Sequence, residues 1–105
     1  MTAFDATPNP VVREGVTASV RLRHAAGLHA RPAVKMTKLA KRFAAKISVA
    51  TSAEGPWIDA KSIVKVMAAR TPRDSLLLFH AEGADAQAAI DALVALVEED
   101  FPDDV

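Results

Sequence analysis

The sequence predicts an α+β fold in the order βαββαβα, with a four-stranded antiparallel sheet and three helices packed on one of its faces. The chain has 105 residues, half of them apolar, which suits one small domain. Apolar residues alternate with polar ones over residues 16–22, as in a strand with one buried face. They recur at helical spacing over residues 29–43 and 86–97. A sheet covered in this way leaves its other face to solvent.

The first half of the chain contains the first predicted strand and a helix with basic residues on its solvated side. The strand is predicted by the alternation of Val16, Ala18, Val20 and Leu22 with polar residues. A helix is expected from His29 to about Phe43. Its apolar stripe is expected to consist of Ala33, Val34, Thr37, Ala40 and Phe43 or Ala44. Its solvated side is expected to carry Lys35, Lys38, Lys41 and Arg42.

A hairpin and a short helix follow. Ile47 and Val49 share one face of a second strand, and Glu54-Gly55-Pro56 predicts the turn into a short third strand at Trp57-Ile58. Ser62 is a natural N-cap for a helix that ends near Ala69.

The last strand and helix complete the order. Residues 71–74 end the short helix before the apolar run Leu76–Phe79, which is the predicted fourth strand. Asp85 is expected to cap the third helix, and Phe101-Pro102 to close it. Its core stripe is expected to consist of Ala86, Ala89, Ile90, Leu93, Val94 and Val97.

Composition narrows the classes of function. Thirteen basic and thirteen acidic side chains cancel, so a global basic field for nucleic acid is absent and no nucleic-acid partner is expected. The chain has no cysteine, which is compatible with a reducing cytoplasm, and no apolar run long enough to span a membrane. Residues 1–15 lack the pattern of a secretory signal and are expected to be a flexible tail before a domain of residues 16–105. A cytoplasmic protein without a membrane partner is expected.

Residues 27–33, with the sequence GLHARPA, predict a phosphate-binding site. The first turn of a helix has N–H groups without intrahelical partners, and its dipole favours an anion. Pro32 suits the first turn, and the guanidinium of Arg31 can bond two phosphate oxygens. A neutral imidazole nitrogen of His29 can attack a phosphoryl group near physiological pH.

With this motif the chain resembles the histidine-containing phosphocarrier HPr of the bacterial phosphoenolpyruvate-dependent phosphotransferase system. The same resemblance holds for a second stretch, Asp59-Ala60-Lys61-Ser62-Ile63-Val64-Lys65-Val66-Met67. The resemblance covers roughly residues 16–101 and implies the HPr-like open-faced sandwich. It implies that His29 accepts a phosphoryl group on Nδ1 from enzyme I and passes it to a IIA-type component, while Arg31 steadies the charge. Such a protein is a stoichiometric carrier, not an enzyme, and needs no cofactor or metal.

The resemblance also suggests regulation and a docking surface. A dedicated kinase phosphorylates the serine that matches Ser62 in many relatives, so an HPr serine kinase/phosphorylase joins the expected partners. The expected docking residues are Ala30, Val34, Lys38, Lys41, Ile63, Val64 and Met67. Val64 is the weaker candidate on the short helix, because one face of that helix must be buried. The protein is expected to be a monomer.

Structural interpretations compete with each role. A histidine near a helix start more often caps the helix or is solvated, but the full motif favours phosphoryl transfer for His29. A cation at Arg31, in the first turn of the helix, is unfavourable against the helix dipole, and an anion bound at the same place would explain it. For Ser62, capping is preferred over regulation. The apolar residues of the short helix can simply belong to the core, and the lysines of the first helix can simply form its solvated face. His24 and His80 are expected to be structural or solvated, since neither has metal-ligand spacing.

Three function classes follow from these features. The leading one is the carrier, and the second is a Ser62-regulated HPr-like binding module that acts mainly through protein contacts. An independent kinase or phosphatase is disfavoured because no nucleotide loop or metal cluster is visible. The motif is common to sugar-uptake, nitrogen-regulatory and dihydroxyacetone-kinase branches, so it leaves the branch open. Compared with the family pattern, the hairpin at residues 52–56 looks longer, and Ala26 replaces a residue that is polar in many relatives.

Overall fold

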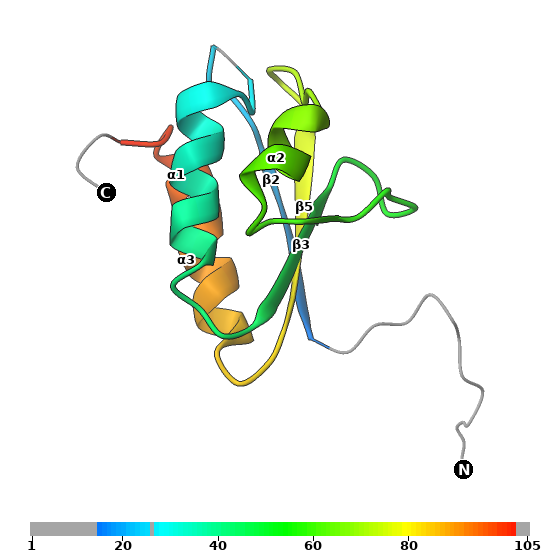
Figure 1. Ribbon diagram of the computed structural model, residues 1–105, viewed down its shortest axis with the longest axis vertical. Coiled ribbons are helices and arrows are strands. Elements are labelled where there is room, and N and C mark those ends of the chain that lie inside the picture. The colour runs from blue at the N-terminus through cyan, green and yellow to red at the C-terminus, as the bar shows by residue number, and fades with distance from the viewer. Residues whose placement is uncertain (1–14, 26, 103–105) are drawn as a thin grey trace.

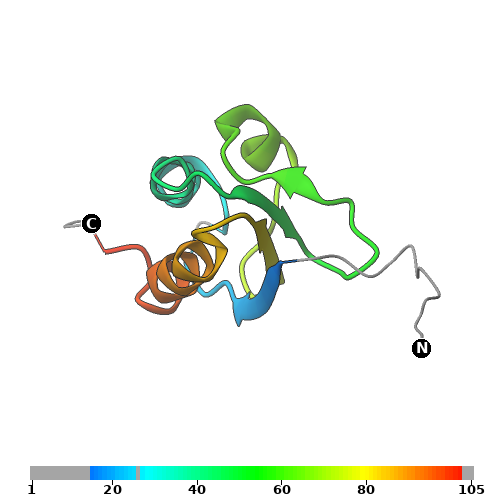
Figure 2. The same cartoon turned by 90° about the horizontal axis from the view of Figure 1, so that it is seen from below.

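Four antiparallel strands form one sheet in the order β2-β5-β3-β4, and three helices lie on one side of it (Figures 1 and 2). The computed structural model describes residues 15–25 and 27–102. Its elements are β2 (Val16–Arg21), α1 (Ala30–Ala40), β3 (Lys46–Ala50), β4 (Ile58–Asp59), α2 (Ile63–Ala68), β5 (Leu76–Glu82) and α3 (Ala86–Glu98). The predicted α+β class, element order and one-sided packing are confirmed.

The core lies between the sheet and the helices. Alternate residues of the interior strand β5, Leu77 and Phe79, are fully buried on the helix side. They belong to one cluster with Met36 of α1, Val66 of α2 and Leu93 of α3. Removing each such side chain from water stabilises the fold by about 1.5–3 kcal/mol.

The helix α1 ends earlier than expected, and a different stripe of it is buried. At its end the N–H groups of Arg42 and Phe43 bond the carbonyls three residues back, which tightens and closes the helix at Ala40. The prediction that Val34 belongs to the core stripe is wrong, because Val34 is 43% exposed. The buried residues are Pro32, Ala33, Met36, Thr37, Leu39 and Ala40, so the buried face is rotated toward Met36 and Leu39.

The expected side-chain cap at Asp85 is also wrong. Asp85 occupies the N-cap position of α3, but within the described chain its carboxylate caps no helical N–H. Its oxygens instead accept the backbone N–H groups of Ala44 at 2.9 Å and Ala45 at 2.8 Å. These bonds, that of Ala44 foremost, lower the pKa of the Asp85 carboxyl. Asp85 thereby ties the loop after α1 to the start of α3.

The remaining elements match with shifted ends. The hairpin of β3 and β4 forms, and β5 continues to Glu82, beyond the predicted end at Phe79. In α3, Leu96 is buried, whereas Val94 of the predicted stripe is only partly buried. The predicted tail and the departure at Ala26 lie outside the described residues, apart from Gly15. In the described ranges, no helix is long and apolar enough to cross a membrane.

Candidate functional site

His29 is the last residue before α1, and its side chain is exposed. Its backbone is extended, with φ −134° and ψ 163°, as an N-cap residue requires. The first bond within the helix runs from the N–H of Ala33 to the carbonyl of His29 at 3.5 Å. Within the described chain the imidazole makes no capping hydrogen bond to α1. The ring is therefore not used to hold the helix and stays accessible at its positive end.

The loop that positions His29 is held by residues far along the chain. The N–H of Leu28 bonds the carbonyl of Thr71 at 2.9 Å, and Leu28 is buried beneath the loop. Gly27 has φ +67°, and a Cβ at this position would lie 2.6 Å from the Thr71 carbonyl oxygen. Two independent features therefore require glycine at this position, the left-handed backbone and the close approach of the Thr71 carbonyl oxygen.

The first turn of α1 carries the other residues of the motif. Ala30 has φ +38°, a left-handed value that costs a non-glycine residue about 1 kcal/mol. Arg31 is exposed in this first turn, and Pro32 is buried beside it. The predicted placement of histidine, guanidinium and proline at one helix start is therefore found in the structure.

His29 opens into a shallow depression of about 720 Å³. Its other wall consists of Val64, Met67, Ala68, Arg70, Thr71 and Pro72. Helices α1 and α2 are in contact, and α2 lies beside the part of α1 that is uppermost in Figure 1. The structure therefore brings the predicted docking residues Val64 and Met67 to the predicted histidine.

The exposure of the α2 residues differs from the burial on which their ranking as docking residues was based. Val64 is 75% exposed, whereas Ile63 and Met67 are partly buried against the core. The buried residue of this short helix is Val66, which turns Val64 outward. On α1, Ala30, Val34 and Lys38 are exposed, and so is Lys41, the C-cap residue of this helix. Lys35 is held to the carboxyl-terminal segment by a 2.9 Å bond to the Pro102 carbonyl.

Ser62 caps α2, as the sequence predicts. Its hydroxyl accepts the backbone N–H of Lys65 at 3.3 Å, and its backbone is extended. The side chain is only half-buried, so the same oxygen is in part accessible to solvent.

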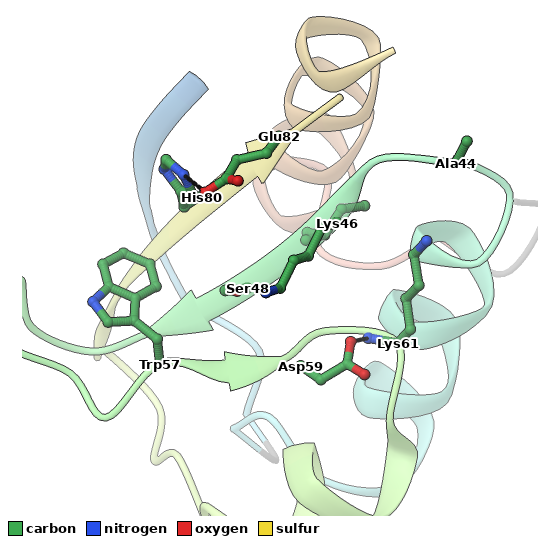
Figure 3. Close-up of a pocket in the computed structure, with 9 residues that line it drawn as sticks. Ala44, Lys46, Ser48, Trp57, Asp59, Lys61, His80 and Glu82 are labelled. Carbon is green, nitrogen blue, oxygen red and sulfur yellow. Dashed lines mark hydrogen bonds and ion pairs between the residues drawn. The ribbon is translucent and has the colours of Figure 1, made fainter. Parts of the chain in front are cut away.

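The other two histidines, His24 and His80, make contacts with neighbouring side chains outside the His29 site. His24 packs edge-on against Phe101, with ring centroids 5.8 Å apart. His80 is only 2% exposed, with Nδ1 2.8 Å from the Thr17 hydroxyl and Nε2 3.0 Å from a carboxylate oxygen of Glu82. It lines a hollow of about 520 Å³ on the open face of the sheet, with Trp57, Lys46 and Lys61 around it (Figure 3). That hollow does not include His29.

Sequence reasoning missed Arg70 and Thr71. Neither belongs to the GLHARPA motif, and no residue type or spacing near position 29 indicates them. Their place in the site depends on a contact between segments that lie about forty residues apart in the sequence, such as the Leu28 to Thr71 bond.

Comparisons with known proteins show the family and the fold of this chain. The family model described as PTS HPr component phosphorylation site matches residues 16–99. The phosphocarrier protein HPr of Cupriavidus necator is 40% identical over 75 residues, which cover 71% of this chain and 82% of that protein. The crystal structure of a phosphocarrier protein HPr from Bacillus anthracis superposes with a TM-score of 0.74 at 34% identity, over 81% of this chain and 99% of that chain.

A longer relative contains the same region. The multiphosphoryl transfer protein of Vibrio cholerae is 41% identical over 78 residues, or 73% of this chain. The match covers only 20% of that relative's length. The fold and these matches define a phosphocarrier domain of the phosphotransferase system. More particularly, the chain belongs to the HPr family.

Proposed function

We propose that His29 receives a phosphoryl group from enzyme I and passes it to a IIA-type component. In each transfer the phosphorus–nitrogen bond of the donor breaks as a bond to the acceptor nitrogen forms, and the departing nitrogen regains its lone pair. The observation that carries this proposal is the exposed imidazole at the start of α1, which the helix does not use as a cap. The family supports it, since HPr proteins are carriers rather than catalysts.

Arg31 is the proposed counter-charge for the phosphoryl group. A cation in the first turn is unfavourable against the helix dipole, and a bound dianion removes that penalty. The guanidinium can offer two parallel N–H groups to phosphate oxygens. We assign Arg31 to charge stabilisation and His29 to the covalent bond.

The proposed docking surface includes Val64 and Met67, which line the depression with His29, and it extends over Ala30, Val34, Lys38, Lys41 and Ile63. Its exposed apolar members lie on α1 and α2, on the two sides of the site. The lysines suit acidic surfaces on enzyme I and on the IIA-type component, and rim charges act mainly on the association rate. Association that weakens as salt rises is therefore expected.

Phosphorylation by phosphoenolpyruvate, enzyme I and magnesium tests the carrier function. Wild type should form an acid-labile adduct, and His29→Ala should form none. His24→Ala is the matched control, because that ring packs on Phe101 outside the motif, and it should be labelled. Unlabelled wild type, or a labelled His29→Ala protein, would overturn the assignment.

Regulation through Ser62 is a second, separable proposal. Phosphate there would lie at the start of α2, and its oxygens can replace the hydroxyl as acceptor for the Lys65 N–H. Incubation with an HPr serine kinase/phosphorylase and ATP should modify wild type but not Ser62→Ala. If His29→Ala kept all cellular function while Ser62→Ala lost it, a regulatory binding module would replace the carrier.

The cellular setting belongs to the same proposal. We place the protein in the cytoplasm, as a monomer, in sugar uptake or a related regulatory branch. Capture of its IIA-type component from the source organism identifies the branch. A partner from the nitrogen or dihydroxyacetone branch would replace the sugar assignment and leave the chemistry of His29 unchanged.

A further inference from the structure

Arg70 contributes to the depression at His29 from a separate segment, the one that follows α2. Helix α2 ends at Ala68 with Ala69 as its C-cap, and Arg70 is the next residue. Its side chain is exposed and lines the same 720 Å³ depression as the imidazole. The site therefore has an arginine on each of two separate segments, Arg31 on α1 and Arg70 after α2.

The backbone at Arg70 favours a different residue type. Arg70 has φ +51°, and its N–H bonds the carbonyl of Met67 at 3.2 Å. This left-handed position after a helix most often holds glycine, and a side chain costs about 1 kcal/mol there. An arginine at this position is therefore not explained by the fold.

Among the described residues, Arg21 and Arg73 have protein partners, whereas the guanidinium of Arg70 has none. Arg73 pairs with the Asp74 carboxylate at 3.8 Å, and Arg21 donates to the Asp74 carbonyl at 2.6 Å. Within residues 15–25 and 27–102, the guanidinium of Arg70 has neither a hydrogen bond nor an ion pair. Its five N–H donors are free for a ligand that arrives in the depression.

We propose that Arg70 is a second cation for the phosphoryl group carried by His29. The inference rests on the proposed function and adds a residue to it. A phosphoryl group on the imidazole has three acceptor oxygens, and Arg70 would bond them from the α2 side while Arg31 does so from the α1 side. The guanidinium stabilises the dianion and takes no part in bond making or breaking.

Direct chemical phosphorylation tests Arg70 without a partner protein. In phosphoramidate the phosphorus–nitrogen bond breaks as the imidazole nitrogen attacks, and ammonia leaves. The ³¹P resonance that is missing in His29→Ala identifies the phosphoryl group on His29. Its pH titration then reports how strongly nearby cations favour the dianion.

Three variants make the titration specific to Arg70. Arg70→Gln removes the charge but keeps a side chain, and Arg70→Gly removes the charge and relieves the left-handed backbone. Arg73→Gln is the matched control, since it removes a charge three residues away whose partner is Asp74. Arg31 on α1 and Lys65 on α2 are unchanged in all three variants.

We expect the acid dissociation constant of the phosphoryl group to fall about two- to fivefold in Arg70→Gln and Arg70→Gly, the range of one exposed charge contact. Arg73→Gln should titrate like wild type. In thermal melts of the unphosphorylated proteins, Arg70→Gly should be at least as stable as wild type, so a loss of fold does not explain the shift.

Each other outcome overturns the inference. A wild-type titration in Arg70→Gln shows that the guanidinium does not contact the phosphoryl group. An equal shift in Arg73→Gln shows a general effect of net charge. Phosphoramidate labels the protein without enzyme I, so this test does not depend on the carrier function. If the Arg70 variants shift the titration but enzyme I leaves the wild type unlabelled, the proposed carrier function fails and this inference stands.

Discussion

The substitution Gly27→Ala tests how the fold holds the histidine. Gly27 precedes Leu28 and His29, and its φ of +67° lies in the left-handed region. A methyl group there would lie 2.6 Å from the carbonyl oxygen of Thr71 and 3.1 Å from the backbone nitrogen of Arg73. Both atoms belong to backbone, so the loop itself must move to make room.

Two costs add in this variant. Holding an L-residue in the left-handed conformation costs about 1–2 kcal/mol. Displacing the packed backbone of residues 71–73 costs about 1–3 kcal/mol, by analogy with overpacking of a core. We therefore expect a loss of about 3 kcal/mol in the free energy of unfolding. For a domain of this size that loss lowers Tm by about 10–25 °C.

Urea unfolding followed by fluorescence measures this loss. Trp57 is the sole tryptophan, and it lies on the far side of the sheet from the helices, so the substitution does not touch the reporter. Ala25→Gly, in the same loop but exposed, is the control and should cost less than about 1 kcal/mol. If Gly27→Ala also cost less than that, the argument from positive φ and close approach would be refuted.

Four further substitutions test other parts of the structure. The backbone N–H of Ala44 is the main group that lowers the pKa of the Asp85 carboxyl. The ionised carboxylate therefore stabilises the fold above its unfolded-state pKa, and this contribution is lost as the pH falls through the lower folded-state pKa. In urea titrations, the difference in the free energy of unfolding between wild type and Asp85→Ala should disappear below about pH 4, and a difference that persists in acid would contradict this. Because His80 is 2% exposed and bonded at both nitrogens, His80→Ala should cost about 1–3 kcal/mol in the same titrations and leave phosphorylation of the protein unchanged. Val64 is 75% exposed, so Val64→Ala should change stability by less than about 0.5 kcal/mol, whereas Val66→Ala should cost about 2 kcal/mol. If Val64 docks enzyme I, calorimetry should show weaker binding in the first variant, and unchanged affinity would remove it from the docking surface.

The element order was readable from the sequence because the patterns that define it are local. Alternation over β2 follows from the pleat of a strand, and it correctly assigned Val20 and Leu22 to the buried side. The cap at Ser62 was equally readable, since the hydroxyl and the Lys65 N–H it accepts lie three residues apart.

Errors arose where distant segments compete for the same group. The helical period over α1 predicted an apolar stripe that included Val34, but the way α1 packs on the sheet rotated the buried face toward Met36. Asp85 had the right position for a cap, yet its carboxylate accepts the N–H groups of Ala44 and Ala45 and, within the described residues, caps no N–H of α3. Neither competition is visible in a window of a few residues.

The candidate site divides in the same way between what is local and what is not. His29 and Arg31 stand out because the helix start, the nucleophile and the counter-charge occupy consecutive residues. The other residues of the depression were hidden, because Arg70 comes near His29 only when the chain folds and the segment after α2 packs against the loop of Leu28. Ala30 and Arg70 both hold left-handed backbone where glycine would be less strained, one beside the imidazole and one across from it. Asp74, Asp100 and Phe101 also have left-handed backbone, so such strain is not confined to the site. The two strained residues beside the exposed histidine are nevertheless what a site shaped for its ligand at some cost to stability should show.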